Sequence, residues 1–207
     1  MVCACLAVVL LILYIAFDVN YFIRVAFLVG LGQFFKKRVN IFDKTSILGW
    51  CTTQDLDIFM RHMNNSRYMR DLDFARFDFY VLTGMYDLMK KKDGHALQGA
   101  STIRYRRPIQ NFSFYRIETK VIDAVDNLHK ILIYWEEKAI YLEHQFITPD
   151  NFVRAIVLTK QNAINFVPDD LIRTLAKDKY KPPVMPEELR EWLTSIETLS
   201  AKLRKSD

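Results

Sequence analysis

The sequence predicts an α+β fold in which one long helix packs against an antiparallel sheet. Apolar residues recur with helical spacing in residues 64–82, at positions i, i+4, i+7 and i+11. From residue 95 onward apolar residues alternate over several consecutive segments, and such segments pair as antiparallel hairpins. No glycine-rich phosphate loop is present, which argues against Rossmann and P-loop folds.

The central helix is predicted to begin at Asn64 or Asn65, because asparagine is a good N-cap, and to end before Gly84. Its apolar face carries Tyr68, Leu72, Ala75 and Phe79. Asp71 and Asp73 lie three or four residues from arginines of the same helix, so surface ion pairs are their expected role.

The sheet is predicted to contain a short strand before the helix and several consecutive strands after it. These segments are Ile47–Thr53, His95–Arg107, Phe114–Val125, Ile131–Thr148 (more than one strand) and Val153–Ile164. Two further helices are expected over Pro168–Lys177 and Pro186–Lys205. This division gives a domain over residues 45–166 and a helical C-terminal extension over residues 167–207.

Composition excludes several classes of protein. The chain has 207 residues, 51% of them hydrophobic, which suffices for one core of ordinary size. The net charge of +5 comes mostly from the first fifty residues, so a nucleic-acid partner is not expected. Only Cys51 lies beyond the apolar start, which excludes a disulfide framework there, and the four histidines are too scattered for a zinc site.

The first 17 residues, Met1–Phe17, carry no charged side chain. A cleaved signal peptide, a buried core helix and a membrane anchor are the competing interpretations, and we favour a transmembrane or anchor helix on length and apolarity. Residues 1–35 then form the anchor and a juxtamembrane segment, in which Val25–Phe35 is expected to lie along the membrane as an amphipathic helix.

The basic cluster Lys36–Arg38 follows this segment, and no basic side chain precedes it. The positive-inside rule therefore places the C-terminal domain in the cytosol. A secreted protein is the alternative, because two glycosylation sequons begin at Asn64 and Asn111.

One motif in the sequence resembles the signature of a known protein family. The stretch Asp55-Leu56-Asp57, followed by His62-Met63-Asn64-Asn65-Ser66, resembles the signature of hotdog-fold thioesterases of the 4-hydroxybenzoyl-CoA thioesterase-like group. Two departures stand out. Four residues rather than the usual three separate Asp57 from His62, and the segment Asp123–Lys130 adds length between two strands, as a longer hairpin or an alternative form of the transcript.

The resemblance implies a hotdog fold, with a long helix wrapped by the sheet, and hydrolysis of a fatty acyl-CoA thioester. Asp57, His62 and Asn65 are the implied catalytic residues, with Asp55 as the alternative base. The backbone around Asn64 and Ser66 would bind the thioester carbonyl. It also implies a homodimer and a coenzyme A thioester as substrate. Together with the apolar start, it indicates an enzyme anchored to the cytosolic face of the endoplasmic reticulum membrane, and no metal or redox cofactor is suggested.

Two further interpretations stay open. Arg104 and Arg106 share one face of a strand, where they either bind the phosphates of coenzyme A or protect a sheet edge. A second catalytic carboxylate lies on the central helix in some hotdog enzymes, and Asp71 is the residue of this helix to test for that role. The altered Asp57–His62 spacing leaves a non-catalytic acyl-binding or protein-interaction module in lipid homeostasis as the alternative function.

Overall fold

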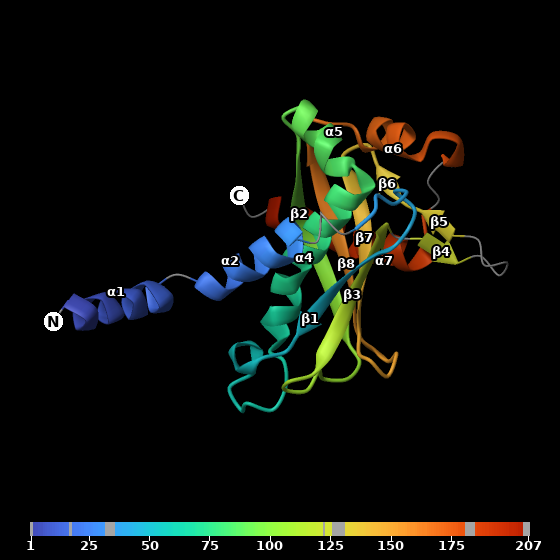
Figure 1. The fold of residues 1–207 in the computed structure, drawn as a ribbon. Coiled ribbons are helices and arrows are strands. Elements are labelled where there is room, and N and C mark those ends of the chain that lie inside the picture. The colour runs from blue at the N-terminus through green and yellow to red at the C-terminus, as the bar shows by residue number, and fades with distance from the viewer. Residues whose placement is uncertain are drawn as a thin grey trace.

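The computed structural model describes residues 2–16, 18–31, 36–121, 123–125, 131–180 and 185–204. Its centre is an antiparallel sheet with the strand order β1-β3-β7-β8-β2 (Figure 1). The strands are β1 (Thr45–Trp50), β2 (His95–Tyr105), β3 (Phe114–Val121), β7 (Ala139–Ile147) and β8 (Val153–Ile164). The predicted α+β class and the antiparallel pairing are confirmed.

Three short strands extend this sheet or lie beside it. They are β4 (Asp123–Val125), β5 (Ile131–Ile133) and β6 (Trp135–Glu136). β6 pairs with β7, whereas β4 and β5 pair antiparallel with each other as a separate hairpin. The added segment Asp123–Lys130 thus begins as a hairpin strand, and residues 126–130 lie outside the described residues.

The central helix α4 (Asn65–Thr83) crosses the inner face of this sheet. The Asn64 side chain accepts a hydrogen bond from the backbone N–H of Ser66, as its predicted N-cap role requires. Gly84 ends the helix with φ 81°, a left-handed conformation that glycine adopts readily, and α5 (Met85–Lys91) follows. All four residues of the predicted apolar face are buried.

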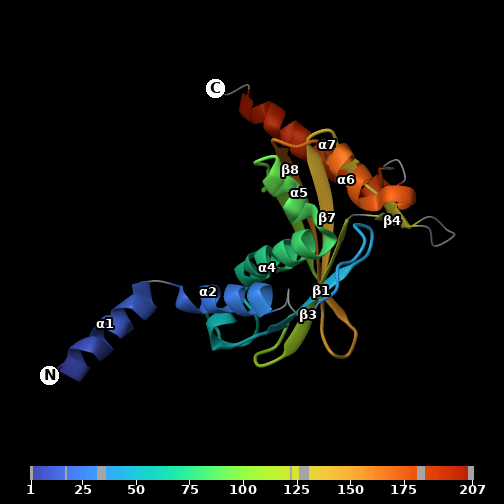
Figure 2. The same cartoon turned by 45° about the horizontal axis from the view of Figure 1, so that its top comes forward.

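Two helices after the sheet cover other parts of it. α6 (Pro168–Ala176) leads into the short helix η3 (Lys177–Lys179) and packs near α5 and β6. α7 (Glu187–Arg204) packs on the opposite face of the sheet from α4, where Leu189 and Leu193 contact Tyr141 (Figure 2). The predicted helices over both segments are therefore confirmed, although residues 181–184 between them are outside the described part.

The N-terminal residues form a separate arm. α1 (Val2–Ala16) projects away from the sheet with its described side chains exposed (Figures 1 and 2). Among the described residues, no helix combines the length and apolarity needed to cross a membrane. The next residues, α2 (Val19–Val25) and the π-helix η1 (Ala26–Leu31), return to the domain; we call residues 19–31 the strap.

The strap packs against α4. The rings of Tyr21 and Phe74 lie 5.0 Å apart, and Val25 contacts the core between α4 and the sheet. Basic residues from this region then pair with acidic residues of the domain: Arg24 with Asp55 (3.0 Å), Lys36 with Asp78 (2.9 Å) and Arg38 with Asp87. The sequence does not predict this attachment, since residues 1–35 are expected there to form a membrane anchor and a juxtamembrane segment.

Gly49 leaves the space on β1 that the Tyr115 ring occupies. A Cβ atom at this position would lie 2.3 Å from Cε2 of Tyr115, its partner across β1 and β3, and the Tyr115 ring is buried. We expect Gly49→Ala to lower the free energy of unfolding by roughly 1–3 kcal/mol through overpacking. Chemical denaturation would measure this loss.

Gly99→Ala is the matched control for that measurement. Gly99 is also in a strand, the edge strand β2, and it is exposed. The atoms nearest to a Cβ at this position belong to the Asn162 side chain. That amide can move, so we expect a smaller loss. Equal losses in the two variants would show that glycine backbone effects, not the Tyr115 ring, set the cost.

Candidate active site

The loop between η2 (Thr53–Asp55) and α4 carries most of the predicted catalytic residues. One carboxylate oxygen of Asp57 accepts hydrogen bonds from the backbone N–H groups of Arg61 (2.9 Å) and His62 (3.3 Å). These bonds hold the pKa of Asp57 below its usual range. The other oxygen lies 3.9 Å from Nε2 of His62. The structure therefore brings Asp57 and His62 together.

The extra residue in this loop is absorbed by a turn. Met60 has φ 53°, a left-handed conformation, and its N–H donates to the carbonyl oxygen of Asp57. The Asp57 N–H in turn donates to the carbonyl oxygen of His62 at 2.9 Å. The spacing of four residues is thus compatible with the pairing of Asp57 and His62.

The start of α4 carries the other motif residues. The Asn64 side-chain oxygen accepts from both the N–H (2.9 Å) and the hydroxyl (2.7 Å) of Ser66. Asn65 is exposed, and its carbonyl oxygen accepts a hydrogen bond from the Tyr105 hydroxyl at 3.0 Å. The Asn64 cap fixes the helix start, and Tyr105 ties that start to the end of β2.

Arg104 and Arg106 lie at the far end of β2. Both are exposed, and Arg106 follows the last residue of the strand. The Arg106 guanidinium lies 4.8 Å from the centre of the Phe152 ring, which Arg107 and Arg154 also approach. The structure therefore gathers several cations around one ring.

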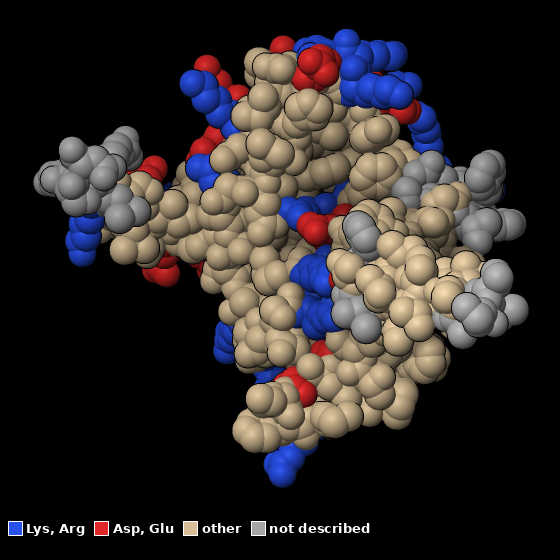
Figure 3. Space-filling view, turned by 90° about the vertical axis from the view of Figure 1, so that its left-hand side faces the viewer, with Lys and Arg blue, Asp and Glu red and all other residues tan. Residues whose placement is uncertain are grey.

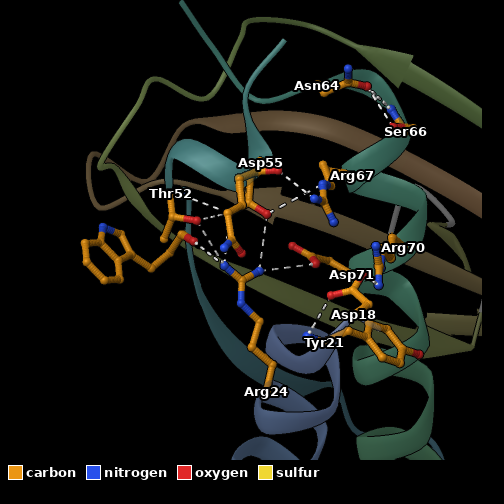
Figure 4. A network of polar contacts seen from close by, with 12 residues as sticks. Asp18, Tyr21, Arg24, Thr52, Asp55, Asn64, Ser66, Arg67, Arg70 and Asp71 are labelled. Carbon is orange, nitrogen blue, oxygen red and sulfur yellow. Dashed lines mark hydrogen bonds and ion pairs between the residues drawn. The ribbon is translucent and has the colours of Figure 1, made fainter. Parts of the chain in front are cut away.

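A buried polar network forms where the strap meets α4 (Figure 4). Asp55 is only 2% exposed, and one of its oxygens accepts from the N–H and the hydroxyl of Thr52, each at 2.8 Å. Arg24 reaches in from the strap and donates to the same carboxylate at 3.0 Å. Burial alone would raise the pKa of Asp55, but these hydrogen bonds and the Arg24 charge outweigh it and lower the pKa.

Asp71 lies on α4, one helical turn after Arg67, and contacts Arg24 on the side away from Asp55 (Figure 4). It is 5% exposed, accepts a hydrogen bond from the Tyr115 hydroxyl, and lies 3.9 Å from the Arg24 guanidinium. Burial raises its pKa to about 6, against the opposing effects of Tyr115 and Arg24. The prediction of a surface ion pair is therefore wrong for Asp71, whereas the exposed Asp73 does pair with Arg76.

An apolar cavity of about 330 Å³ adjoins this network. Its walls come from the strap, β1, β3 and α4, and most of its lining is apolar: Ile23, Phe27, Ile47, Phe74 and Ile117. Asp71 and Arg24 are the charged residues on its wall. An apolar cavity with a few convergent polar groups and a carboxylate of raised pKa is the usual character of a ligand site.

Other reactive side chains of the core do not have the properties of catalytic groups. Burial raises the pKa of the Cys51 thiol to about 11, so the thiol is protonated at neutral pH. Burial lowers the pKa of His144 to about 3, and its two ring nitrogens lie between the hydroxyls of Thr119 and Thr159. Among the described residues, no cluster of side chains could hold a metal ion.

Sequence reasoning missed Arg24 and gave Asp71 only a minor place. Asp71 lies three residues after Tyr68 and directly before Leu72, within the apolar stripe of α4, and this position was the signal for burial. No comparable signal existed for Arg24, because its partner Asp55 is 31 residues away in the sequence.

Comparisons with known proteins agree with this architecture. A family model for the thioesterase-like superfamily matches residues 51–193. A protein from Drosophila melanogaster, named Protein THEM6, is 51% identical over 199 residues, which cover 96% of this chain and 97% of the relative. The resemblance inferred from the motif is confirmed.

Solved structures share the fold at lower identity. A probable thioesterase from Escherichia coli, YbaW, aligns with a TM-score of 0.52 and 21% identity, over 67% of this chain and 98% of that one. The Staphylococcus aureus protein SAV2348, solved in complex with CoA, aligns with a TM-score of 0.53 and 13% identity, over 74% and 96% of the two chains. These likenesses establish the hotdog-like fold.

Proposed function

Because this chain belongs to the thioesterase-like superfamily, we propose that it hydrolyses a fatty acyl-CoA thioester. The supporting observation is Asp71, a buried carboxylate whose pKa is raised to about 6, on the wall of the apolar cavity. A carboxylate of this pKa is largely ionised at neutral pH yet still basic enough to take a proton from water. The cavity offers an apolar space of the kind that an acyl chain needs.

The chemistry assigns a role to each charged residue of the cavity. Asp71 takes a proton from a water molecule as the water oxygen bonds to the thioester carbon. The negative charge that develops on the carbonyl oxygen is stabilised by the Arg24 guanidinium, which lies 3.9 Å from Asp71. When the carbon–sulfur bond breaks, the coenzyme A thiolate accepts the proton from Asp71, which leaves a free fatty acid and a free thiol.

The test is thiol release by the full chain in detergent across acyl-CoAs of increasing chain length. The full chain is needed because the strap supplies Arg24 and part of the cavity wall. Asp57→Asn, measured alongside, tests the base implied by the family motif. Activity lost in Asp57→Asn would move the reaction to the loop at the start of α4, and no thiol release from any acyl-CoA would reject the function.

We also propose attachment to the cytosolic face of the endoplasmic reticulum membrane and assembly as a homodimer. α1 and its exposed apolar side chains support the first. The second is supported by β2, an exposed edge strand of 11 residues whose backbone can pair with a second copy. Cell fractionation and light scattering in detergent would test these two proposals separately.

A non-catalytic acyl-binding or interaction module is the second candidate function. It is favoured by the D-x-D motif itself, because Asp55 and Asp57 are both engaged in hydrogen bonds that hold the local backbone. Such a module would bind an acyl ligand without releasing a thiol. Binding of a radiolabelled acyl-CoA by the unaltered full chain, with no thiol released from it, would support this second function.

Arg104 and Arg106 give a prediction about the nucleotide end of the substrate. If they bind the phosphates of coenzyme A, replacing either one by alanine should raise the KM for acyl-CoA about tenfold, since a charged hydrogen bond contributes on the order of 1.5 kcal/mol. The KM for an acyl-N-acetylcysteamine thioester, which lacks these phosphates, should not change. Equal changes for both substrates would assign the two arginines to the stability of the sheet edge.

A further inference from the structure

The loop that precedes α4 carries three consecutive exposed apolar residues. Ile58 is 89% exposed, Phe59 76% and Met60 65%. The turn at Met60 places them at the tip of the loop. Single exposed apolar residues are common on soluble proteins, but a contiguous group is typical of an interaction surface.

A second apolar group lies at the nearby end of the sheet. The Trp50 ring is 47% exposed and stacks on the exposed Phe114 ring, with the centroids 5.8 Å apart. The Trp50 indole N–H donates to the carbonyl oxygen of Phe112 at 3.3 Å, so the polar atom of this side chain already has a partner. An apolar ring surface is left facing outward.

The strap and α1 continue this surface. Ile23 and Phe27 of the strap are exposed and border the same cavity as Trp50 and Phe114. The Tyr14 hydroxyl of α1 accepts a hydrogen bond from Gln54 at 2.5 Å, directly before the loop. Figure 3 views this side and shows charged side chains gathered in a hollow near the middle and at the margins, with uncharged residues between.

We propose that the domain itself docks on the lipid bilayer, next to α1, through an apolar rim formed by Ile23, Phe27, Trp50, Phe114 and the loop tip 58–60. This rests on the membrane attachment proposed above. Several separate protrusions suit a deformable lipid surface better than they suit the groove of a protein. Tryptophan and phenylalanine are favourable at the interface between lipid and water, and the exposed Arg61 is placed to reach the lipid headgroups.

Docking in this way would turn the mouth of the cavity toward the lipid. Moving an acyl chain from a bilayer into water is unfavourable, and the cost grows with each CH₂ group of the chain. A chain that passes from the bilayer directly between Trp50 and Phe27 avoids most of this cost. The ligand class that fits this arrangement is a long-chain acyl compound whose chain is dissolved in the membrane.

The experiment uses the full chain on vesicles of phosphatidylcholine with brominated acyl chains, which quench tryptophan fluorescence on contact. The other two tryptophans, Trp135 and Trp192, pack within the domain. We therefore expect quenching in the unaltered chain and loss of most of it in Trp50→Phe. Flotation of the vesicles reports attachment separately from the docking of the domain.

Charge variants refine this test. Phe59→Glu should reduce Trp50 quenching while the protein still floats with the vesicles, and it should not affect folding because Phe59 is exposed. Leu199→Glu is the matched control: Leu199 is a similarly exposed apolar residue, but it lies on α7. It should leave quenching unchanged.

Three outcomes would overturn the proposal. Flotation without Trp50 quenching would mean that α1 alone holds the protein and that the domain stays off the membrane. A change in particle mass on Phe59→Glu, measured in detergent, would show that the rim covers a second copy of the chain. Failure of the unaltered chain to float would contradict both the proposed membrane attachment and the docking of the domain. The assay of thiol release would still test the proposed activity independently.

Discussion

Asp71→Asn is expected to slow acyl-CoA hydrolysis by two to four orders of magnitude, the usual contribution of a general base. Asparagine has nearly the same shape and can still accept the Tyr115 hydrogen bond. The fold should therefore persist, and the loss should appear in kcat rather than in KM. Single-turnover thiol release at saturating substrate would measure it.

The pH profile provides a second readout of the same residue. Because burial raises the pKa of Asp71 to about 6, activity should rise with pH through this value and level off above it. Asp73→Asn is the matched control, since Asp73 is an exposed carboxylate on the same helix. Unchanged kcat in Asp71→Asn would contradict the assignment and return the role of base to Asp57 or Asp55.

Arg24→Ala is expected to lower the free energy of unfolding by about 2–4 kcal/mol at neutral pH. It removes the cation that two nearly buried carboxylates share, and the loss of a partner by a buried charge is costly. Asp55 keeps the Arg67 guanidinium at 3.7 Å, which moderates the loss. The figure is below that of a fully buried pair because the Arg24 side chain is 25% exposed. Denaturant titration in detergent would measure the change.

The penalty should depend on pH. Asp55 has a lowered pKa in the native state, so its stabilising contribution is present above its unfolded pKa and is lost as the pH falls. Asp71 has a raised pKa, so the native state loses stability as the pH rises from about 4 to about 6. Both effects make the loss in Arg24→Ala greater at pH 7 than at pH 4.5.

The control for this prediction is Arg38→Ala. Arg38 also joins the N-terminal region to the domain, but its side chain is 72% exposed and its partner Asp87 is 51% exposed. An exposed pair of this kind contributes at most about 1 kcal/mol. Equal losses in the two variants would contradict a special role for the buried network.

Local patterns were sufficient to predict most of the fold. Asn64, the stripe that begins at Tyr68, and Gly84 define α4 to within one residue, because caps and apolar spacing depend on neighbouring residues. β8 has the predicted bounds Val153–Ile164. β1 ends at Trp50 rather than Thr53, because Thr52 leaves the strand to start the turn that contains Asp55.

The site could be predicted only in part. The motif drew attention to the segment from Asp55 to Ser66, whose residues do lie together at the start of α4. The cavity next to Asp71 is built by contacts between the strap, β1, β3 and the helix, which are distant in sequence. An apolar segment that covers a domain and one that lies on a membrane have the same composition, so the strap was not recognised from the residues alone.

The position of α7 limits how many copies can associate. Leu189 and Leu193 cover the apolar end of the outer sheet face around Tyr141, and farther along that face Lys120 pairs with Glu143. Among the described residues, this face therefore offers little bare apolar area for stacking a second sheet. The pairing of two copies proposed at β2 would be isologous, so each copy would occupy the β2 edge of the other. α7 therefore disfavours the stacking of sheets face to face as a way to add copies beyond the proposed pair.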